Sequence, residues 1–315
     1  MATVQSSLNP VRYLAEEHLM PPSAQCPLCG APVSGKPARK PIVLQENPVV
    51  ILVKCSRCRA VSASRLPSAA YLQTYYASYY NEFQNAPRVA FRDIRRFAVH
   101  IASGAAPGKP QDTIRLLDYG GGDGRIALET ARCLLERAAG RKAEVDCFDL
   151  SGTPPAPSPQ AEISIRACAR PEDFAGRLYH GIIASAVFEH IPHPRPVMKT
   201  LLAALEPGGW LYARTPYMVP LIAPAGILGL RIPFGFPAHL HDLGPAFWRR
   251  CLAILGLEAT HALVRSQPSI IETSLRDYPA RTIMAWCLKQ PRRIMGGLWP
   301  LVGGWEVWIR RAGRD

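Results

Sequence analysis

Residues 116–126 read LLDYGGGDGRI. Two apolar residues and an acid lead into four glycines within the five positions from Gly120 to Gly124. A glycine turn between a strand and a helix brings bare backbone close to a nucleotide-like ligand. The dinucleotide fingerprint G-x-G-x-x-G does not fit, because Arg125 stands where its third glycine is expected. The run therefore predicts a cofactor of another class.

Segments with strand and helix patterns alternate around this turn. We expect buried strands at 114–117, 144–148, 161–167, 181–185, 210–214 and 305–311, and helices at 125–139, 196–205 and 245–255. Alternating βα units of this length predict an α/β fold with a doubly wound, mostly parallel sheet. Such sheets bind ligands beyond the carboxyl ends of their strands.

Two Cys-x-x-Cys pairs stand near the start of the chain. They are Cys26 with Cys29 and Cys55 with Cys58. Four thiolates close a tetrahedral zinc site without an open position, so we expect a structural zinc ion in a small zinc ribbon. The run PIVLQENPVVILVKC between the pairs reads as a hairpin that returns the chain to the metal. The alternative of two unrelated redox pairs lacks the βαβ context that such motifs accompany.

The other five cysteines have no such spacing. We expect them to be small buried hydrophobic residues: Cys133, Cys147, Cys168, Cys251 and Cys287. An odd total of nine cysteines and no apolar signal segment at the start favour a reducing, cytoplasmic environment.

The chain divides into three expected parts. Residues 1–66 form the zinc-binding module, 67–110 a tyrosine-rich helical linker or lid, and 111–315 the main domain with an apolar insertion at about 216–240. In the second part we expect helices at 67–84 and 88–103, whose tyrosines either attach the module to the main domain or cover an active site. With 315 residues, 48% of them hydrophobic, the chain is long enough for one large domain and a small one.

The net charge of +13 is concentrated at the two ends. Residues 1–66 and residues 275–315 each carry eight Lys and Arg against three acids. A basic end favours nucleic acid, phospholipid or a phosphorylated substrate, although it also serves solubility. The apolar run at 215–230 is too short and too broken by proline to span a bilayer. Segment 275–300, which alternates apolar and basic residues, is a candidate for peripheral contact with an anionic membrane.

The glycine turn resembles the first motif of the class I S-adenosylmethionine-dependent methyltransferases, an apolar strand followed by acid-x-G-x-G-x-G. The resemblance implies a Rossmann-like, seven-stranded domain with S-adenosylmethionine as cofactor. Gly120, Gly122 and Gly124 would let the backbone approach the amino-acid part of the cofactor. Asp118 would order the loop or hold the cofactor ammonium through water.

A second acid is expected at the end of the second strand of this domain. In the family that the chain resembles, an acid at this position takes the ribose hydroxyls. Asp149 stands there, with Asp146 as the runner-up. A carboxylate can accept two hydroxyl donors and leave neither unpaired.

The run IIASAVFEHIPHP at 182–194 and the later P-G-G before a strand resemble a branch that includes ubiquinone-pathway O-methyltransferases and sugar methyltransferases. Glu189 and His190 match the E-H pair of that branch, and Phe188 beside them is a further cofactor-binding candidate. Members of the family usually have an aspartate at the start of the fourth strand, expected here at 181–185, whereas this chain has His180-Gly181 at that position.

The front half is similar to bacterial methyltransferases of surface-glycan and natural-product clusters. Their two Cys-x-x-Cys pairs, a proline and a tyrosine-rich helix occur here as CPLCG, CSRC, RLPS and YYASYY. This resemblance implies O- or C-methylation of a small-molecule, sugar or lipid-linked acceptor. Two alternatives stay open: an RNA methyltransferase with a basic zinc module, and a non-catalytic cofactor-binding subunit.

Methylation of a hydroxyl requires removal of its proton, for which histidine is suited. His190 follows the fourth strand, and His239 and His241 precede the helix at 245–255. The family that the chain resembles often places a histidine before this helix, where it borders the acceptor pocket. Together with Glu189, these three histidines are the catalytic candidates. Glu189 is expected to pair with His190, orient the acceptor or bind a metal, whereas His193 lies between prolines and is expected at the surface.

Overall fold

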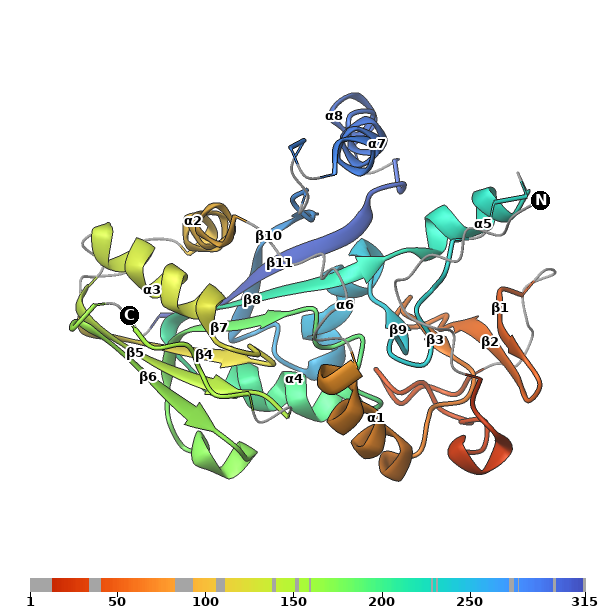
Figure 1. Ribbon diagram of the computed structural model, residues 1–315, viewed down its shortest axis with the longest axis horizontal. Helices are drawn as coiled ribbons and strands as arrows, with labels where there is room; N and C mark the ends of the chain where they lie inside the picture. Colours follow the sequence, from red (N-terminus) through yellow and green to blue (C-terminus); the bar gives the residue numbers. More distant parts are fainter. Residues whose placement is uncertain are drawn as a thin grey trace.

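The computed structural model describes most of the chain (Figure 1). The described residues are 13–33, 41–82, 93–105, 111–137, 140–150, 153–158, 160–227, 229–230, 232–271, 275–276, 278–296 and 299–313. Within them lie a seven-stranded sheet with helices on both faces and a smaller sheet near the N-terminus.

The large sheet has the strand order β10-β11-β8-β7-β4-β5-β6. Its strands are β4 (Gln111–Tyr119), β5 (Gly140–Phe148), β6 (Ile163–Cys168), β7 (Tyr179–Ser185), β8 (Leu205–Tyr217), β10 (His261–Pro268) and β11 (Gly303–Arg311). All neighbouring pairs from β8 to β6 are parallel, and β11 is antiparallel to both β8 and β10. The predicted α/β fold with a mostly parallel seven-stranded sheet is confirmed.

Side-chain alternation in the strands creates two cores, one on each face of the sheet. On β4, Leu116 packs with Phe97 of α2 (Ile94–Gly104) and Ala127 of α3 (Arg125–Glu136). The next residue, Leu117, packs in the opposite core with Leu201 of α4 (Pro194–Ala203) and with α6 (Pro245–Leu255). Figure 1 shows these two helical layers on either side of the sheet. Because both faces are covered, the strands read as nearly continuous apolar runs in the sequence.

The observed elements extend or shorten those expected from the sequence. Strand β8 begins at Leu205 rather than 210, because Leu205 already pairs with Tyr179 of β7; the continuous pairing with β7 and β11 starts at Trp210. Strand β10 was not predicted. Helix α1 (Ala69–Glu82) occupies most of the expected 67–84 segment, and residues 88–92 of the next expected helix lie outside the described residues. The structure also contains two short 3₁₀ helices, η1 (Glu16–His18) and η2 (Pro171–Asp173).

The expectation that all five unpaired cysteines are buried is wrong for one of them. Cys287 is exposed, whereas the other four are buried. It lies on α7 (Pro279–Lys289), which stands outside the two helical layers of the sheet (Figure 1).

The small sheet joins the N-terminal module to the main domain. Strands β1 (Val43–Glu46) and β2 (Val49–Lys54) form the predicted hairpin, and β3 (Val61–Ala63) pairs with β2. Its fourth strand, β9 (His241–Asp242), comes from the main domain and pairs with β3. Phe234, Phe236 and Leu240 of the apolar insertion pack in the same core as β2.

Two helical segments leave the carboxyl edge of the large sheet. Helix α5 (Val219–Ile227) follows β8, while α7 and α8 (Arg292–Met295) follow β10, which runs in the same direction as β8. Both therefore stand at the edge where ligands of such sheets bind. Within the described ranges, none of the helices combines the length and the apolar sequence that a membrane crossing requires.

Candidate active site

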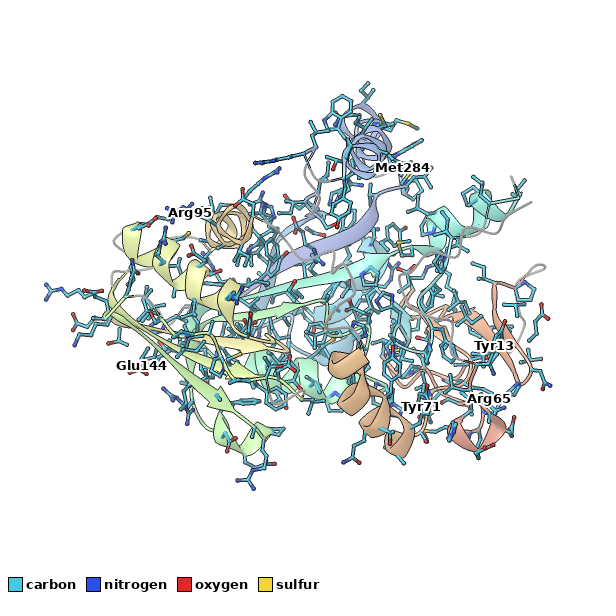
Figure 2. All side chains as sticks on the ribbon, in the orientation of Figure 1. Tyr13, Arg65, Tyr71, Arg95, Glu144 and Met284 are labelled. Carbon is cyan, nitrogen blue, oxygen red and sulfur yellow. The ribbon has the colours of Figure 1, made fainter. Side chains whose placement is uncertain are left out.

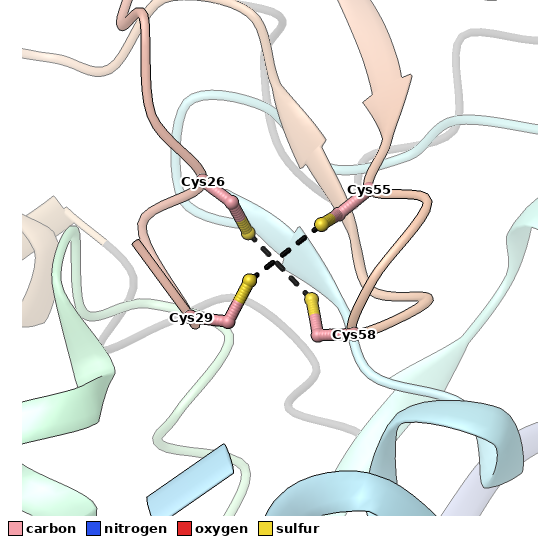
Figure 3. Close-up of side chains that lie close together, drawn as sticks. All are labelled: Cys26, Cys29, Cys55 and Cys58. Atoms are coloured by element: carbon pink, nitrogen blue, oxygen red, sulfur yellow. Dashed lines mark hydrogen bonds between the residues drawn. The ribbon is translucent and has the colours of Figure 1, made fainter. Parts of the chain in front are cut away.

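Four buried cysteine sulfurs converge in the N-terminal module (Figure 3). The Cys26 and Cys58 sulfurs are 3.6 Å apart, as are those of Cys29 and Cys55. All four lie within 4.8 Å of one another. A tetrahedral zinc site with Zn–S bonds of about 2.3 Å places its sulfurs about 3.8 Å apart. The cluster thus has the composition and spacing of a closed structural zinc site.

The two Cys-x-x-Cys segments fold into the same turn. The Cys26 amide donates to Ala31 O, and the Gly30 amide donates to Cys26 O. The second segment repeats both bonds, from Cys55 to Ala60 O and from Arg59 to Cys55 O. Gly30 and Arg59 occupy equivalent positions with φ near +70°. Repetition of the turn explains how two distant segments present their sulfurs to one point.

The glycine turn links β4 to α3 at the carboxyl edge of the large sheet. The Gly120 amide donates to Phe148 O at 2.7 Å, and the Gly122 amide donates to Asp149 Oδ2 at 2.8 Å. A Cβ added to Gly120 would meet Val187 Cγ2 at 2.6 Å, whereas one added to Gly122 would meet no atom of the described residues within 4 Å. The turn is therefore fixed against β5 and leaves open space beside Gly122, as a backbone cradle for a ligand requires.

Asp118 points a buried carboxylate toward this turn. Its side chain is 3% exposed, and within the described part of the chain its Oδ2 has no hydrogen-bond partner. Burial, with a further contribution from Asp149, raises the pKa of Asp118 to about 7. A positively charged group placed beside this oxygen would satisfy it and favour its ionised form. The residues at this turn thus fit a cofactor that carries an ammonium group.

The two aspartates proposed for the ribose have different surroundings. Asp146 receives hydrogen bonds from Arg166 Nε at 2.9 Å and from the Tyr179 hydroxyl at 2.6 Å. Asp149 follows β5 directly and is only half-buried beside the glycine turn. These contacts favour Asp149 for a ligand and a structural role for Asp146.

Glu189 and His190 lie in a tight turn after β7, beside His239 of a distant segment. The Leu240 amide donates to Glu189 O at 2.8 Å and so joins the two segments. The rings of His190 and His239 are 4.9 Å apart, and Glu189 Oε1 lies 3.8 Å from His190 Nε2. The structure therefore brings together three of the four catalytic candidates.

Backbone carbonyl groups fix the tautomers of both rings. His190 Nδ1 donates to Ala238 O at 2.8 Å, and His239 Nδ1 donates to Phe234 O at 2.9 Å. Because a carbonyl oxygen only accepts, each Nδ1 carries the hydrogen and each Nε2 keeps a lone pair. Burial lowers the pKa of His190 to about 3 and lowers that of His239 as well. Both rings are thus neutral at pH 7.

A row of aromatic rings connects the N-terminal module to this cluster along α1. His18 lies 5.1 Å from Tyr71, which stacks on Tyr75 at 6.0 Å. Tyr75 contacts Tyr76 edge-on at 5.2 Å, and Tyr76 contacts His190 edge-on at 6.4 Å. The tyrosines of this helix thus pack on the N-terminal module, and one of them contacts His190.

The fourth catalytic candidate, His241, is placed differently. Its ring is fully buried, its Nε2 donates to Ile191 O, and its Nδ1 accepts from Ser62, both at 2.9 Å. These contacts tie the module to the loop after β7. Phe188 is also buried in the core, with its ring 6.1 Å from that of Trp248, and His193 is exposed before α4. The contacts of His241 and Phe188 indicate packing roles.

One further acid, Asp242, is buried beside these groups. Asp242 Oδ2 accepts from the amides of Met218 and Val219, at the start of α5. Burial raises the pKa of this carboxyl to about 7. Asp242 precedes α6 in the sequence but caps α5, so its position in the sequence does not indicate the helix that it caps.

Comparison with known proteins identifies the family of the chain. The methyltransferase domain family matches residues 80–262, more than half of the chain. No curated protein matches the chain.

The solved structures that resemble the fold are distant. The plantazolicin methyltransferase BpumL in complex with SAH is 13% identical, with 76% of this chain and 95% of that chain covered and a TM-score of 0.46. A putative methyltransferase in complex with the Haloferax volcanii Trm112 methyltransferase activator is 12% identical (79% and 99% covered, TM-score 0.43). A putative sarcosine dimethylglycine methyltransferase from Galdieria sulphuraria is 14% identical (76% and 99% covered, TM-score 0.42).

Proposed function

This chain belongs to the methyltransferase domain family and is an S-adenosylmethionine-dependent methyltransferase, and we propose that it methylates a small-molecule, sugar or lipid-linked acceptor at oxygen or carbon. The observation that carries the cofactor assignment is the pairing of open space beside Gly122 with the partnerless buried oxygen of Asp118. S-adenosylmethionine supplies an activated methyl group for in-line displacement. The protein therefore has mainly to position the two reactants.

The residues around the glycine turn are assigned to the cofactor. Gly120, Gly122 and Gly124 provide the backbone cradle, and Asp118 pairs with the ammonium group. Asp149 anchors the turn through the Gly122 amide and takes the ribose hydroxyls. Support for this assignment comes from the positive φ of all three glycines and from the position of Asp149 at the end of β5.

The acceptor side is assigned to Glu189, His190 and His239. Glu189 and His190 follow the carboxyl end of β7, the strand next to β4, so they stand one strand away from the glycine turn. His239 comes from the segment before β9 and lies beside His190. Tyr76 of α1 forms a wall of the same space. These polar side chains orient the acceptor atom, while α1 limits access of water.

We assign a structural zinc ion to the four cysteines, on the fit of their sulfur positions. Zinc in modules of this size contributes on the order of 10–16 kcal/mol to folding. The ion would hold β3, and β3 holds β9 and the loop of His239. Its role toward the reaction is therefore indirect.

A lipid-linked acceptor is supported by the outer face of α7. Ala280, Ile283, Met284 and Cys287, spaced as one helical stripe, are all exposed. Figure 2 shows Met284 on this helix. Residues 278–296 carry four basic residues and no acid. An apolar helix face with basic neighbours suits the interface of an anionic bilayer. Since α7 stands at the ligand edge of the sheet, contact there would bring a membrane-held acceptor to the site.

The test is transfer of labelled methyl groups from S-adenosylmethionine to separate acceptor pools: a lipid extract, a mixture of sugars and natural-product scaffolds, and total RNA. We expect label in one of the first two pools, lost in Asp118→Ala and kept in the surface control His193→Ala. Label confined to RNA would replace this proposal with the RNA alternative. Calorimetry that shows no binding of S-adenosylmethionine would refute the cofactor assignment itself.

A further inference from the structure

We propose that Glu189, His190 and His239 bind one divalent transition-metal ion, separate from the four-cysteine site. The proposal deepens the proposed function, because it assigns the acceptor-side chemistry of the same pocket to a metal centre. Its ligands would be one carboxylate oxygen and two imidazole nitrogens. This donor set suits zinc, manganese, iron or cobalt and differs from the sulfur set of the N-terminal module.

The distances already approach those of a metal site. One ligand atom from each of the three residues lies within 4.8 Å of the other two. Bonds of about 2.0–2.2 Å place neighbouring ligand atoms about 2.8–3.6 Å apart. The separation of 3.8 Å between Glu189 Oε1 and His190 Nε2 is only slightly longer. A small inward movement of His239 would complete the set.

The hydrogen bonds behind the two rings are those that metal-binding histidines make. A ligating histidine typically donates its other ring nitrogen to a carbonyl or carboxylate, which fixes the ring and its tautomer. Here both Nδ1 atoms donate to backbone carbonyls, at 2.8 Å for His190 and 2.9 Å for His239. Both Nε2 lone pairs are thereby available, and the two rings lie side by side, tilted by 57°, at a centroid separation of 4.9 Å.

The backbone holds the three ligands in place before any ion binds. Glu189 and His190 are neighbours in the turn after β7, where the His190 amide donates to Val187 O at 2.9 Å. The residue after His239 donates its amide to Glu189 O at 2.8 Å, which couples the two segments. Because these bonds fix both segments, binding would cost little further ordering of the chain.

Three protein ligands leave coordination positions open, unlike the closed cysteine site. An acceptor hydroxyl that occupies an open position would have its pKa lowered by the ion, and its proton would pass to solvent or to a buffer base. The acceptor class implied is a hydroxylated molecule with a second oxygen close enough to chelate. The methyl group would then pass from the sulfonium sulfur to the acceptor oxygen, leaving S-adenosylhomocysteine.

Metal stoichiometry tests the proposal without reference to activity. The full-length protein is dialysed against chelator, and elemental analysis establishes how much zinc the cysteines retain. Cobalt(II) is then titrated and followed by visible absorption, with manganese(II) followed by calorimetry. We expect one further ion per chain, whose cobalt spectrum lacks the strong sulfur-to-metal charge-transfer bands of thiolate ligation.

Variants identify the ligands. Glu189→Gln and His239→Ala should each abolish the additional ion at concentrations that fill the wild-type site, while retaining the zinc of the cysteines. His193→Ala, a neighbouring surface histidine, should bind both ions. Unchanged melting temperature and unchanged S-adenosylmethionine affinity in Glu189→Gln would show that the loss is local and leaves the proposed function standing.

Two results would overturn the proposal. One is a metal content that stays at one ion per chain, the zinc of the four cysteines, when cobalt(II), manganese(II) and zinc(II) are each raised to millimolar concentration. The other is an additional ion that persists in both Glu189→Gln and His239→Ala. Either result would leave the cluster as a hydrogen-bonding surface for the acceptor.

Discussion

The buried carboxylate of Asp118 makes the stability of the cofactor-free protein depend on pH. Its pKa is raised from 3.8 to about 7 by burial and by Asp149. Because the folded-state pKa lies above the unfolded one, the folded protein binds the extra proton, and stability falls as pH rises from about 4 to about 7. At 1.36 kcal/mol per pKa unit, the ionised group costs the folded state about 4 kcal/mol above pH 7.

Asp118→Asn removes that cost while keeping the shape of the side chain. Without cofactor, we expect the variant to be more stable than wild type at pH 8, by up to about 4 kcal/mol, and nearly equal to it near pH 4. Urea unfolding at several pH values measures the difference. If the difference in free energy of unfolding between the two proteins does not change with pH, burial does not raise the pKa of Asp118 as the structure implies.

The same substitution should have the opposite effect on the cofactor. In wild type, affinity for S-adenosylmethionine should rise by up to about tenfold per pH unit between pH 5 and 7, because the ionised carboxylate pairs with the ammonium. In Asp118→Asn it should be weaker and independent of pH over this interval. Calorimetry of both proteins decides the matter, and equal affinities at pH 7 would refute the assignment of Asp118 to the ammonium.

Four further outcomes are expected. Gly122 and Gly208 both have positive φ and open space for a Cβ, so Gly122→Ala and its control Gly208→Ala should each lose about 1–2 kcal/mol of stability in urea unfolding. Only Gly122→Ala should also lose cofactor affinity, by tenfold or more in calorimetry. Equal cofactor affinities of the two variants would contradict the role of Gly122 in the backbone cradle. Cys55→Ser should lower both bound zinc and melting temperature, and a variant unchanged in both would exclude the metal site. Glu306→Ala, which leaves His100, Tyr212 and Gln267 without their buried acceptor, should cost about 3–5 kcal/mol of stability at unchanged cofactor affinity. Met284→Asp on the apolar face of α7 should reduce sedimentation with vesicles that contain anionic lipid; binding equal to wild type would remove the membrane proposal.

The large sheet was predictable because its determinants are local. Each central strand is a short apolar run, and the glycine turn marks the first strand-to-helix junction. Strand β10 escaped prediction because His261 to Pro268 mixes polar and apolar residues at the edge of the sheet. Strand β9 was beyond sequence reasoning, because two residues have no pattern of their own and their pairing with β3 spans some 180 positions.

The candidate site was predictable in its members but not in its arrangement. The E-H pair and the histidines before α6 were identified from motifs, yet nothing in the sequence distinguishes His239 from His241. The two side chains point to opposite sides of the segment that leads into β9. His239 therefore lies beside His190, and His241 bonds to Ser62. Only the register of β9 against β3 decides which of the two borders the acceptor space.

That register makes the N-terminal module part of the site rather than an appendage. The backbone of Leu240 donates to Glu189 O and accepts from the Ala63 amide, so one residue bonds both the candidate site and β3. His241 adds a second link between Ser62 and the loop after β7. Strand β3 follows the second cysteine pair in the sequence. If the four cysteines hold the proposed zinc ion, we expect its loss to release β3, then β9, and with them the segment that positions His239. The proposed ion would thus be coupled to the geometry of the candidate site through a chain of backbone hydrogen bonds.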